Sequence, residues 1–478
     1  MHCRSRFLSH LVGGLLAALL IAPVALAAEE DLPSGDIWLQ HVSRDLLPFW
    51  SSSDALGSPV GEFPTFRCND GKLFDAHSPC PELANPPDWI KPEIGRDYLR
   101  MRARQTYAYG VAFHLTGDPR WLEAARAGAR STLRSLDPER GAPAWIKEGS
   151  AASFEETTAQ DQSYAVVGIA MLYYLTRDPE LEKALVAHEK FIFKAFWDGQ
   201  QLRWLPNGVA GDEGARQELV AQLDQLNAYM LLVAPYLPAA ERVHWQTDIR
   251  RLCDVIVKRY HDPQSGYFFG TRGTPGSEKP GSRHNDFGHT IKSYWMLTLA
   301  GRELGDQKLE AFAKEGARKV LERAWVAQTR SWGSQWTRNG IDENKQWWIY
   351  AELDQMATTL ALEDAGQAYR LAGSWDFWLK HLVDHQSGEV WGWVQADGWV
   401  PPDMLKIHQW KSGYHSFEHA LVSYLGAQAL AGRPAKLYFA TGHTDALFRP
   451  YVLPGSVTGI ESKGRYETVT FRLPRPER

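Results

Sequence analysis

The chain has 478 residues, of which 44% are hydrophobic, and a net charge of −5 from 52 basic and 57 acidic side chains. This mild charge, without a basic stripe that alternates with aromatic residues, argues against a nucleic acid as partner. The length allows two or three average domains or one large domain built from repeats. Twenty tryptophans suit stacking on sugar rings, but they also fill cores and so give only a hint.

The first residues, 1–27, have the pattern of a secretory signal peptide. A basic start with Arg4 and Arg6 precedes an apolar run at 11–25, and Ala25-Leu26-Ala27 forms a small-x-small cleavage signal. The apolar run is short for a membrane span and no later run is long enough, so we expect no membrane span. The sequence therefore predicts an exported protein, periplasmic or secreted.

Residues 28–97 are expected to form an N-terminal helix followed by a proline-rich loop. Cys68 and Cys80 flank a polar segment of this loop, and export favours a disulfide between them over two free thiols. Cys253 lies in a helical pattern and is expected to be an inert core thiol.

Residues 98–431 consist of apolar-periodic segments separated by two alternating kinds of turn. The sequence TGDP at 116–119 recurs as TRDP at 176–179, sixty residues later. A second series of turns, each followed by an aromatic residue, begins at Asp137, Asp198, Asp262 and Asp384. Two turns within sixty residues indicate one helical hairpin per repeat, with about six repeats if the opening helix is counted. The pattern predicts an all-α fold of the α/α barrel type, and the missing strands argue against a TIM barrel.

Residues 432–478 change character to aromatic and β-branched residues punctuated by proline and glycine, especially at 437–474. They predict a short β-rich tail, which can cover one end of the helix ring.

The segment DFGHTIKSYW (286–295) is expected to turn from a loop into an apolar helix. His289 and Lys292 are three residues apart, so they share one helix face, where ionisable groups are costly unless they are used. The alternative is a solvated helix start with a hydrogen-bonded histidine.

Five segments resemble inner helices of the N-acylglucosamine 2-epimerase superfamily, which includes cellobiose 2-epimerases and mannose and sulfoquinovose isomerases. They occur in the family's order and are RARQTYAYG (102–110), QDQSYAVVGIAMLYYLTRDP (160–179), DFGHTIKSYWML (286–297), QWWIYAELDQM (346–356) and QWKSGYHSFEHAL (409–421). The resemblance implies an (α/α)6 barrel with a pocket at its mouth, and proton transfer at carbon 2 of a sugar without a cofactor or a metal.

By this resemblance, His289 and His415 form the proton-transfer pair, since histidine titrates near working pH. Arg104 steadies the developing oxyanion, and Trp347 or Trp410 stacks on the sugar. The further substrate-binding candidates are Glu352, Asp161 and Tyr414. Two structural alternatives are a buried ion pair of Arg104 with Glu352 or Asp161, and a hydrogen-bonded core role for His415.

Two positions depart from the family pattern. Lys292 stands where the family has glutamate, and LDQLNAYMLL (223–232) places Asp224 and Asn227 where a His-x-x-Glu helix is expected. The charges could have been exchanged together to keep a paired site, or Lys292 could have a lowered pKa and act as a base. Lys292 could also bind an anionic group such as a uronate or sulfonate, or the epimerase site could be lost.

The segment HSFEH (415–419) also fits the H-x-x-E-H pattern of zinc peptidases. A zinc site would need a third protein ligand nearby, and only the β-rich tail follows, so we do not favour it.

A rival prediction is a polysaccharide hydrolase or lyase, for which export would argue. Hydrolysis needs two carboxylates across a cleft, and the candidates are Asp161, Asp224, Glu352 and Asp354. A lyase could use Lys292 to neutralise a uronate, with His289 and Tyr414 as bases. A third possibility is a sugar-binding barrel without catalysis, and the sequence leaves the oligomeric state open.

Overall fold

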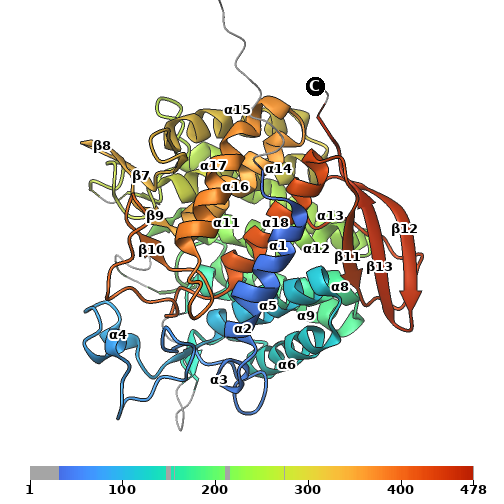
Figure 1. The fold of residues 1–478 in the computed structure, drawn as a ribbon, viewed down its shortest axis with the longest axis horizontal. Helices are drawn as coiled ribbons and strands as arrows, with labels where there is room; N and C mark the ends of the chain where they lie inside the picture. The colour runs from blue at the N-terminus through green and yellow to red at the C-terminus, as the bar shows by residue number, and fades with distance from the viewer. Residues whose placement is uncertain are drawn as a thin grey trace, which may run out of the picture.

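The computed structural model describes residues 32–146, 152–154, 157–209, 211, 216–273 and 275–476. The described chain is mostly helical and ends in a small sheet, which confirms this much of the predicted fold (Figure 1). The predicted signal peptide at 1–27 lies outside the described residues. Within them, no helix combines the length and apolarity that crossing a bilayer requires.

Six inner helical segments form a closed ring. They are α5 (Leu99–Thr116), α7 with α8 (Ala159–Ala165 and Val167–Thr176), α11 with α12 (Leu219–Gln225 and Leu231–Val233, joined by the π-helical segment η4, Leu226–Met230), α14 (Phe287–Leu304), α16 (Trp347–Ala361) and α18 (Tyr414–Leu430). Each segment packs against the next, and α18 packs against α5, so the ring closes. Inner helices are buried on all sides, as in α5, where every residue from Leu99 to Leu115 is buried.

Each inner segment is accompanied by an outer one. The outer segments are α1, η2 and α2 (Gly35–Gln40, His41–Leu46 and Leu47–Trp50), α6 (Pro119–Ser135), α9 (Pro179–Phe196), α13 with η6 (Ala239–Val255 and Ile256–Tyr260), α15 (Gln307–Ala324) and α17 with η8 (Tyr369–Phe377 and Trp378–Leu382). The opening helix α1 packs on the last inner helix, α18. Short helices at α3 (Ser53–Leu56) and α4 (Pro81–Ala84) belong to the N-terminal loop.

The repeated TGDP turn explains how the chain reverses between inner and outer helices. Gly117 ends α5 in the left-handed region with φ 69°, and Arg177 takes the equivalent place after α8 with φ 57°. Asp118 and Asp178 then accept a hydrogen bond from the backbone N–H two residues ahead and cap the outer helices, whose first residue is proline. Each residue type thus has a defined role: a left-handed C-terminal residue, an N-cap carboxylate and a proline at N1.

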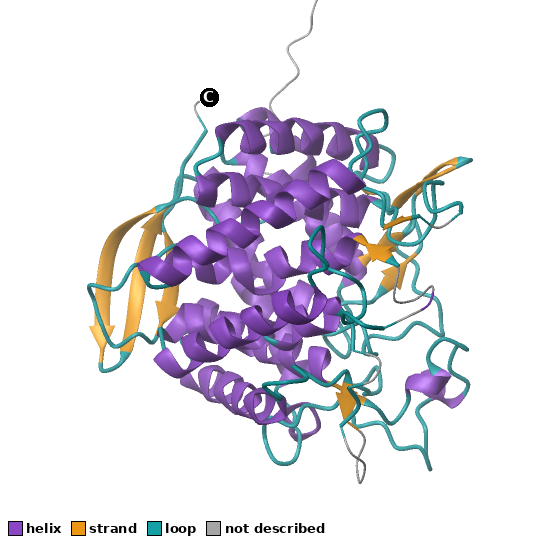
Figure 2. Ribbon diagram, turned by 180° about the vertical axis from the view of Figure 1, so that it is seen from behind, coloured by secondary structure: helices purple, strands orange, loops and turns teal. Residues whose placement is uncertain are grey.

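Short two-stranded pairs and the C-terminal sheet lie at opposite ends of the helices (Figures 1 and 2). The two-stranded pairs are β1 with β2 (Asp97–Tyr98, Trp145–Ile146), β3 with β4 (Gln217–Glu218, Thr271–Arg272), β5 with β6 (Trp325–Val326, Ser331–Trp332), β7 with β8 (Gln335–Thr337, Gly340–Asp342) and β9 with β10 (Lys345–Gln346, Trp393–Val394). The antiparallel sheet has the order β11-β13-β12, from Ala435–Phe439, Tyr466–Arg472 and Ser456–Lys463.

The sheet closes one end of the ring. The backbone N–H of Ala440, just after β11, donates to the carbonyl of Leu175 near the end of α8. His114 Nδ1, near the end of α5, lies 2.9 Å from the carbonyl oxygen of Tyr438. The short two-stranded pairs lie at the other end of the ring, where the inner helices begin.

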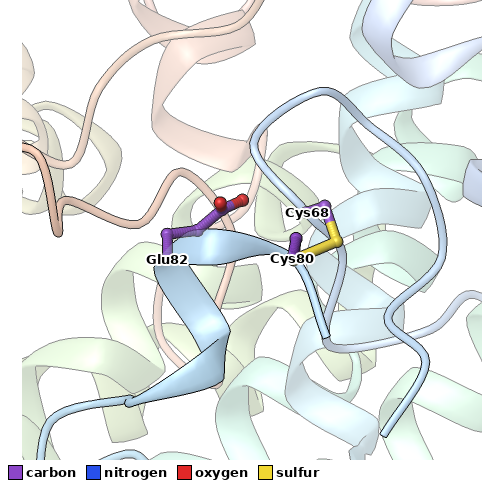
Figure 3. Close-up of side chains that lie close together, drawn as sticks. All are labelled: Cys68, Cys80 and Glu82. Atoms are coloured by element: carbon purple, nitrogen blue, oxygen red, sulfur yellow. A yellow bond between two sulfur atoms is a disulfide. The ribbon is translucent and has the colours of Figure 1, made fainter. Parts of the chain in front are cut away.

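Cys68 and Cys80 form a disulfide in the N-terminal loop, as the sequence predicted (Figure 3). Glu82 lies beside it and accepts a hydrogen bond from the backbone N–H of Asn69. The Asn69 side chain reaches the carbonyl of Met404 at 2.8 Å, which attaches this loop to the segment before α18. Cys253 is a buried free thiol, also as predicted.

We predict that this fold loses stability in mild acid because of buried histidines. Burial lowers the pKa of His114 to about 3 and that of His188 to about 4, so both are neutral in the native state. Below pH 6.5 the unfolded chain takes up protons that the native chain does not, so stability falls as pH falls, by about 1.4 kcal/mol per histidine and pH unit. Urea unfolding at a series of pH values measures this slope.

His114→Gln removes one of these protons and is expected to flatten the slope between pH 6.5 and 4 by about 1.4 kcal/mol per pH unit. An unchanged slope in this variant would contradict the assignment, whatever the variant's absolute stability.

Candidate active site at the mouth of the helix ring

A cavity of about 390 Å³ opens where the inner helices begin. It brings together all five residues that the sequence predicted to be catalytic and both tryptophans predicted to stack on a sugar: Arg104, Asp224, His289, Lys292, His415, Trp347 and Trp410. Residues that are far apart in the chain therefore share one cavity because each lies in the first two turns of an inner helix or in the loop before it.

The helices deliver side chains to this cavity in a common register. Arg104, Tyr164, Asp224, Lys292 and Glu352 are each the sixth residue of their helix. The first three follow one another at intervals of sixty residues, the period of the repeat. Since the sixth residue lies one and a half turns into a helix, these side chains form a ring just below the helix ends.

Lys292 and Asp224 form a buried ion pair with 2.7 Å between Nζ and Oδ1. Lys292 also donates to Tyr164 Oη at 3.0 Å, and Gln160 donates to the second oxygen of Asp224 at 2.7 Å. Burial opposes the charge of Lys292, but Asp224, Tyr164 and Glu352 outweigh it and raise its pKa. Lys292 is thus a fixed cation, and the hypothesis that it acts as a base with a lowered pKa is wrong.

The imidazole of His289 is held by Asp286, the N-cap residue of α14. One oxygen of Asp286 accepts from the backbone N–H of His289, and the other lies 2.7 Å from His289 Nδ1. This contact places the proton on Nδ1 and leaves Nε2 free to accept one. The ring packs edge-on against Trp348, with 4.7 Å between centroids, and at 4.6 Å from His284.

His415 lies in the first turn of α18 between two buried carboxylates. Its Nδ1 is 3.9 Å from Glu352 and 3.9 Å from Glu418, and it has no hydrogen-bond partner among the described residues. The alternative of a hydrogen-bonded core histidine is therefore wrong. Burial, with the charges of Lys292 and Arg104, lowers the pKa of His415 well below its usual value, so the ring is neutral near pH 7.

Arg104 is held without a carboxylate. Its guanidinium stacks over Tyr164 at 3.9 Å, and Nη1 donates to the carbonyl of Trp410 at 3.0 Å. The predicted alternative of an ion pair with Glu352 or Asp161 is wrong, because Asp161 pairs with Arg100 at 2.6 Å instead. This cation lies at the cavity wall and no carboxylate of the described chain neutralises it, so it can stabilise a negative charge on a ligand.

Three residues predicted to bind substrate do not line the cavity. Asp161 is engaged by Arg100, and Tyr414 and Glu352 are buried beneath the lining. Burial and the charge of Glu418 raise the pKa of Glu352, against the opposing effect of Lys292. These three side chains lie beneath the cavity wall, and their contact with a substrate stays a prediction.

The carboxylates proposed for hydrolysis do not form a catalytic pair. Asp161 and Glu352 lie outside the lining, and Asp354 is buried and accepts from Trp332 at 2.7 Å. Of the lining carboxylates, Asp224 and Asp286 both have a pKa held below the usual value, after the opposing effect of burial, by Lys292 and His289 respectively. A general acid for glycoside cleavage needs a raised pKa, and neither of them has one.

The H-x-x-E-H pattern does not gather its two histidines at one point. His419 Nε2 contacts Asp354 at 2.8 Å and its ring stacks on Trp378, away from the cavity that His415 lines. The arrangement gives the zinc-peptidase prediction no support.

Sequence reasoning missed half of the lining residues. They are Gln160, Tyr164, Arg283, His284, Asp286, Gln346 and Trp348. Asp286 had a signal, since an aspartate three residues before His289 fits an N-cap, and the sixth-residue register would have identified Tyr164. Arg283 and His284 come from an irregular loop with no such pattern.

Comparisons with known proteins find sugar epimerases among the proteins similar to this chain. The profile of the family described as N-acylglucosamine 2-epimerase (GlcNAc 2-epimerase) matches residues 91–420. A cellobiose 2-epimerase of Bacteroides fragilis is 24% identical over 344 residues, which cover 66% of this chain and 84% of that protein. A cellobiose 2-epimerase of Dictyoglomus turgidum is 28% identical over 141 residues, covering 27% of this chain and 34% of that protein.

Solved structures share the fold. The cellobiose 2-epimerase of Spirochaeta thermophila has a TM-score of 0.66 at 19% identity and covers 83% of this chain and 97% of its own. A D-mannose isomerase has a TM-score of 0.64 at 13% identity, covering 81% and 97%. An α-1,6-mannanase of Salegentibacter has a TM-score of 0.51 at 12% identity, covering 82% and 99%.

We predict that the two halves of the buried ion pair depend on each other. Lys292→Met leaves Asp224 charged without its cation, and Asp224→Asn leaves Lys292 short of its main counter-charge. Each single change is expected to destabilise the fold by about 3–5 kcal/mol, and the double variant by less than the sum. Urea unfolding of the four proteins measures the coupling, and strictly additive losses would contradict it.

Proposed function

Because the chain belongs to the N-acylglucosamine 2-epimerase family of sugar epimerases and isomerases, we propose that its cavity moves a proton at carbon 2 of a reducing sugar, with His289 and His415 as the pair. The observation that carries this proposal is that both histidines line one cavity although they lie far apart in the sequence. We also interpret its ring as the (α/α)6 barrel, supported by the six inner segments that close on one another.

His289 suits the role of proton acceptor. Asp286 fixes the tautomer in which Nε2 has a free lone pair, and the carboxylate stabilises the imidazolium that forms when that nitrogen takes the proton. When the carbon–hydrogen bond breaks, its electrons move into an enediolate between carbons 1 and 2 of the opened sugar.

His415 suits return of a proton to carbon 2 or carbon 1. When Nε2 of its neutral ring gives a proton to carbon, Nδ1 must take one up. Burial raises the pKa of Glu352 and Glu418, so either carboxyl group, 3.9 Å from Nδ1, can supply that proton. Return to the opposite face of carbon 2 gives the epimer, and return to carbon 1 gives the ketose. In the reverse reaction the two histidines exchange roles.

The cations of the cavity stabilise the enediolate. Arg104 has no carboxylate partner in the described chain, and Lys292 is a permanent cation held in place by Asp224. The helix N-termini that surround the cavity add positive electrostatic potential to that of these two side chains. Charge that is fixed in place before the reaction costs no reorganisation when the oxyanion develops.

We further propose that the substrate carries an acidic group. Three cations line the cavity, Arg104, Arg283 and Lys292, against the two carboxylates Asp224 and Asp286. Arg283 is half exposed and lies 3.5 Å from the buried Glu218, and Lys292 is paired with Asp224. Arg104 is then the lining cation that has no carboxylate partner among the described residues. This excess positive charge favours a sugar acid such as a uronate over a neutral sugar.

We predict that the hydrogen at carbon 2 of the substrate exchanges for deuterium when the reaction runs in heavy water. Proton NMR should show that signal disappear from a reducing sugar, faster for glucuronate than for glucose if the acidic preference holds. His289→Asn and His415→Asn are each expected to slow the exchange by about 10²–10⁴-fold, because each removes a proton-transfer group.

His443→Gln changes an exposed histidine of the C-terminal segment and serves as a control with unchanged rate. Exchange that persists in either cavity variant, or that occurs with no sugar of the neutral and acidic series, would contradict the proposed chemistry.

We propose that the protein acts outside the cytoplasm. The signal-peptide pattern at 1–27 supports this, and so does the Cys68–Cys80 disulfide, which persists in oxidising compartments. In a Gram-negative host, the full chain is expected in the periplasmic fraction with its N-terminus at Ala28. N-terminal sequencing checks this, and an uncleaved chain in the cytoplasm would contradict it.

A further inference from the structure

Three side chains of possible metal-binding type meet between two outer helices, on residues that do not line the cavity. Glu189 comes from α9, and His244 and Asp248 come from α13. Because His244 and Asp248 are four residues apart, they share one face of α13. Their ligand atoms and that of Glu189 all lie within 4.8 Å of one another.

Glu189 is a buried carboxylate without a hydrogen bond. Its side chain is 0% exposed, and neither of its oxygens has a hydrogen-bond partner among the described residues. Burying a carboxylate without such a partner is costly, and buried carboxylates are generally paired or bound to metal ions.

The distances around His244 fit a metal ion better than hydrogen bonds. Its Nε2 lies 3.4 Å from Glu189 Oε2 and 3.4 Å from Asp248 Oδ2. Ordinary hydrogen bonds from nitrogen to oxygen measure about 2.7–3.2 Å. In a tetrahedral zinc site with bonds of about 2.0–2.1 Å, the ligand atoms are separated by roughly 3.3–3.4 Å.

The surroundings of the cluster leave it accessible and oriented. The side chain of His244 is 45% exposed, so an ion can enter from solvent. Arg251 holds the other oxygen of Asp248 at 2.8 Å, an arrangement that orients a ligating carboxylate. Lys190 beside Glu189 is paired with Glu241 at 3.2 Å.

We propose that Glu189, His244 and Asp248 bind a divalent metal ion of the zinc type, which ties α9 to α13. One imidazole nitrogen and two carboxylates supply three ligands, and water completes the tetrahedron. The imidazole selects zinc over magnesium and calcium, which prefer oxygen ligands. The site is structural, because it lies between two outer helices on residues that do not line the cavity.

Calorimetric titration of the untagged, EDTA-treated full chain with ZnCl₂ tests the proposal. We expect one ion per chain, and weaker binding of Mg²⁺ and Ca²⁺. At a free zinc concentration of about 100 Kd, the melting temperature should rise by about 3 °C for a chain of this length. Co²⁺ in place of zinc should give the intense visible absorption of a tetrahedral site.

His244→Gln changes a half-exposed side chain and should fold, while Glu189→Gln preserves the shape of the buried one. Both are expected to weaken zinc binding more than tenfold, and His443→Gln, the exposed control, should bind as the unaltered chain does. Absence of zinc binding, or equal binding by His244→Gln, would overturn the proposal, the latter because the ion would then lie elsewhere.

Discussion

The site depends on a constraint of chain direction. An outer helix returns the chain between successive inner helices, so all inner helices begin at the same end of the ring. Six helix N-termini therefore surround one cavity, and the partial positive charges of their free N–H groups point toward it. The C-terminal sheet occupies the other end, so the fold leaves one mouth for a ligand (Figure 2).

The same constraint explains why charged side chains can be kept inside apolar helices. A residue one and a half turns from the helix start faces its counterparts on neighbouring helices, so a charge at that depth can find a partner there. Lys292 finds Asp224, Tyr164 and Glu352 in this way. The cation is tolerable at this depth because the neighbouring helix presents an acid to it, which keeps the buried pair neutral overall.

The outer helices also bury an ionisable side chain, Glu189, away from the cavity. Their buried faces are mostly apolar, and the Glu189 carboxylate is an exception that no described hydrogen bond relieves. The fold of the ring does not require that acid, and the chemistry proposed for the cavity does not use it. A second, structural role at that position is consistent with both facts.

The sequence by itself determined most of the elements and half of the residues that line the cavity. The sixty-residue spacing of the Asp-Pro turns predicted the helical hairpins, because an αL residue, an N-cap aspartate and a proline at N1 act locally. The family motifs likewise identified His289, His415 and Arg104, and the loop cysteines predicted their disulfide.

Only the tertiary structure decided which polar groups touch. It paired Asp161 with Arg100 rather than with Arg104, placed Glu352 and Tyr414 beneath the cavity wall, and brought Arg283 and His284 to its rim from an irregular loop. These outcomes depend on contacts between helices sixty or more residues apart, and on how the ring closes. Local patterns fix how a helix begins and ends, whereas the partner of a buried charge is set by whichever side chain the neighbouring helix presents at the same depth.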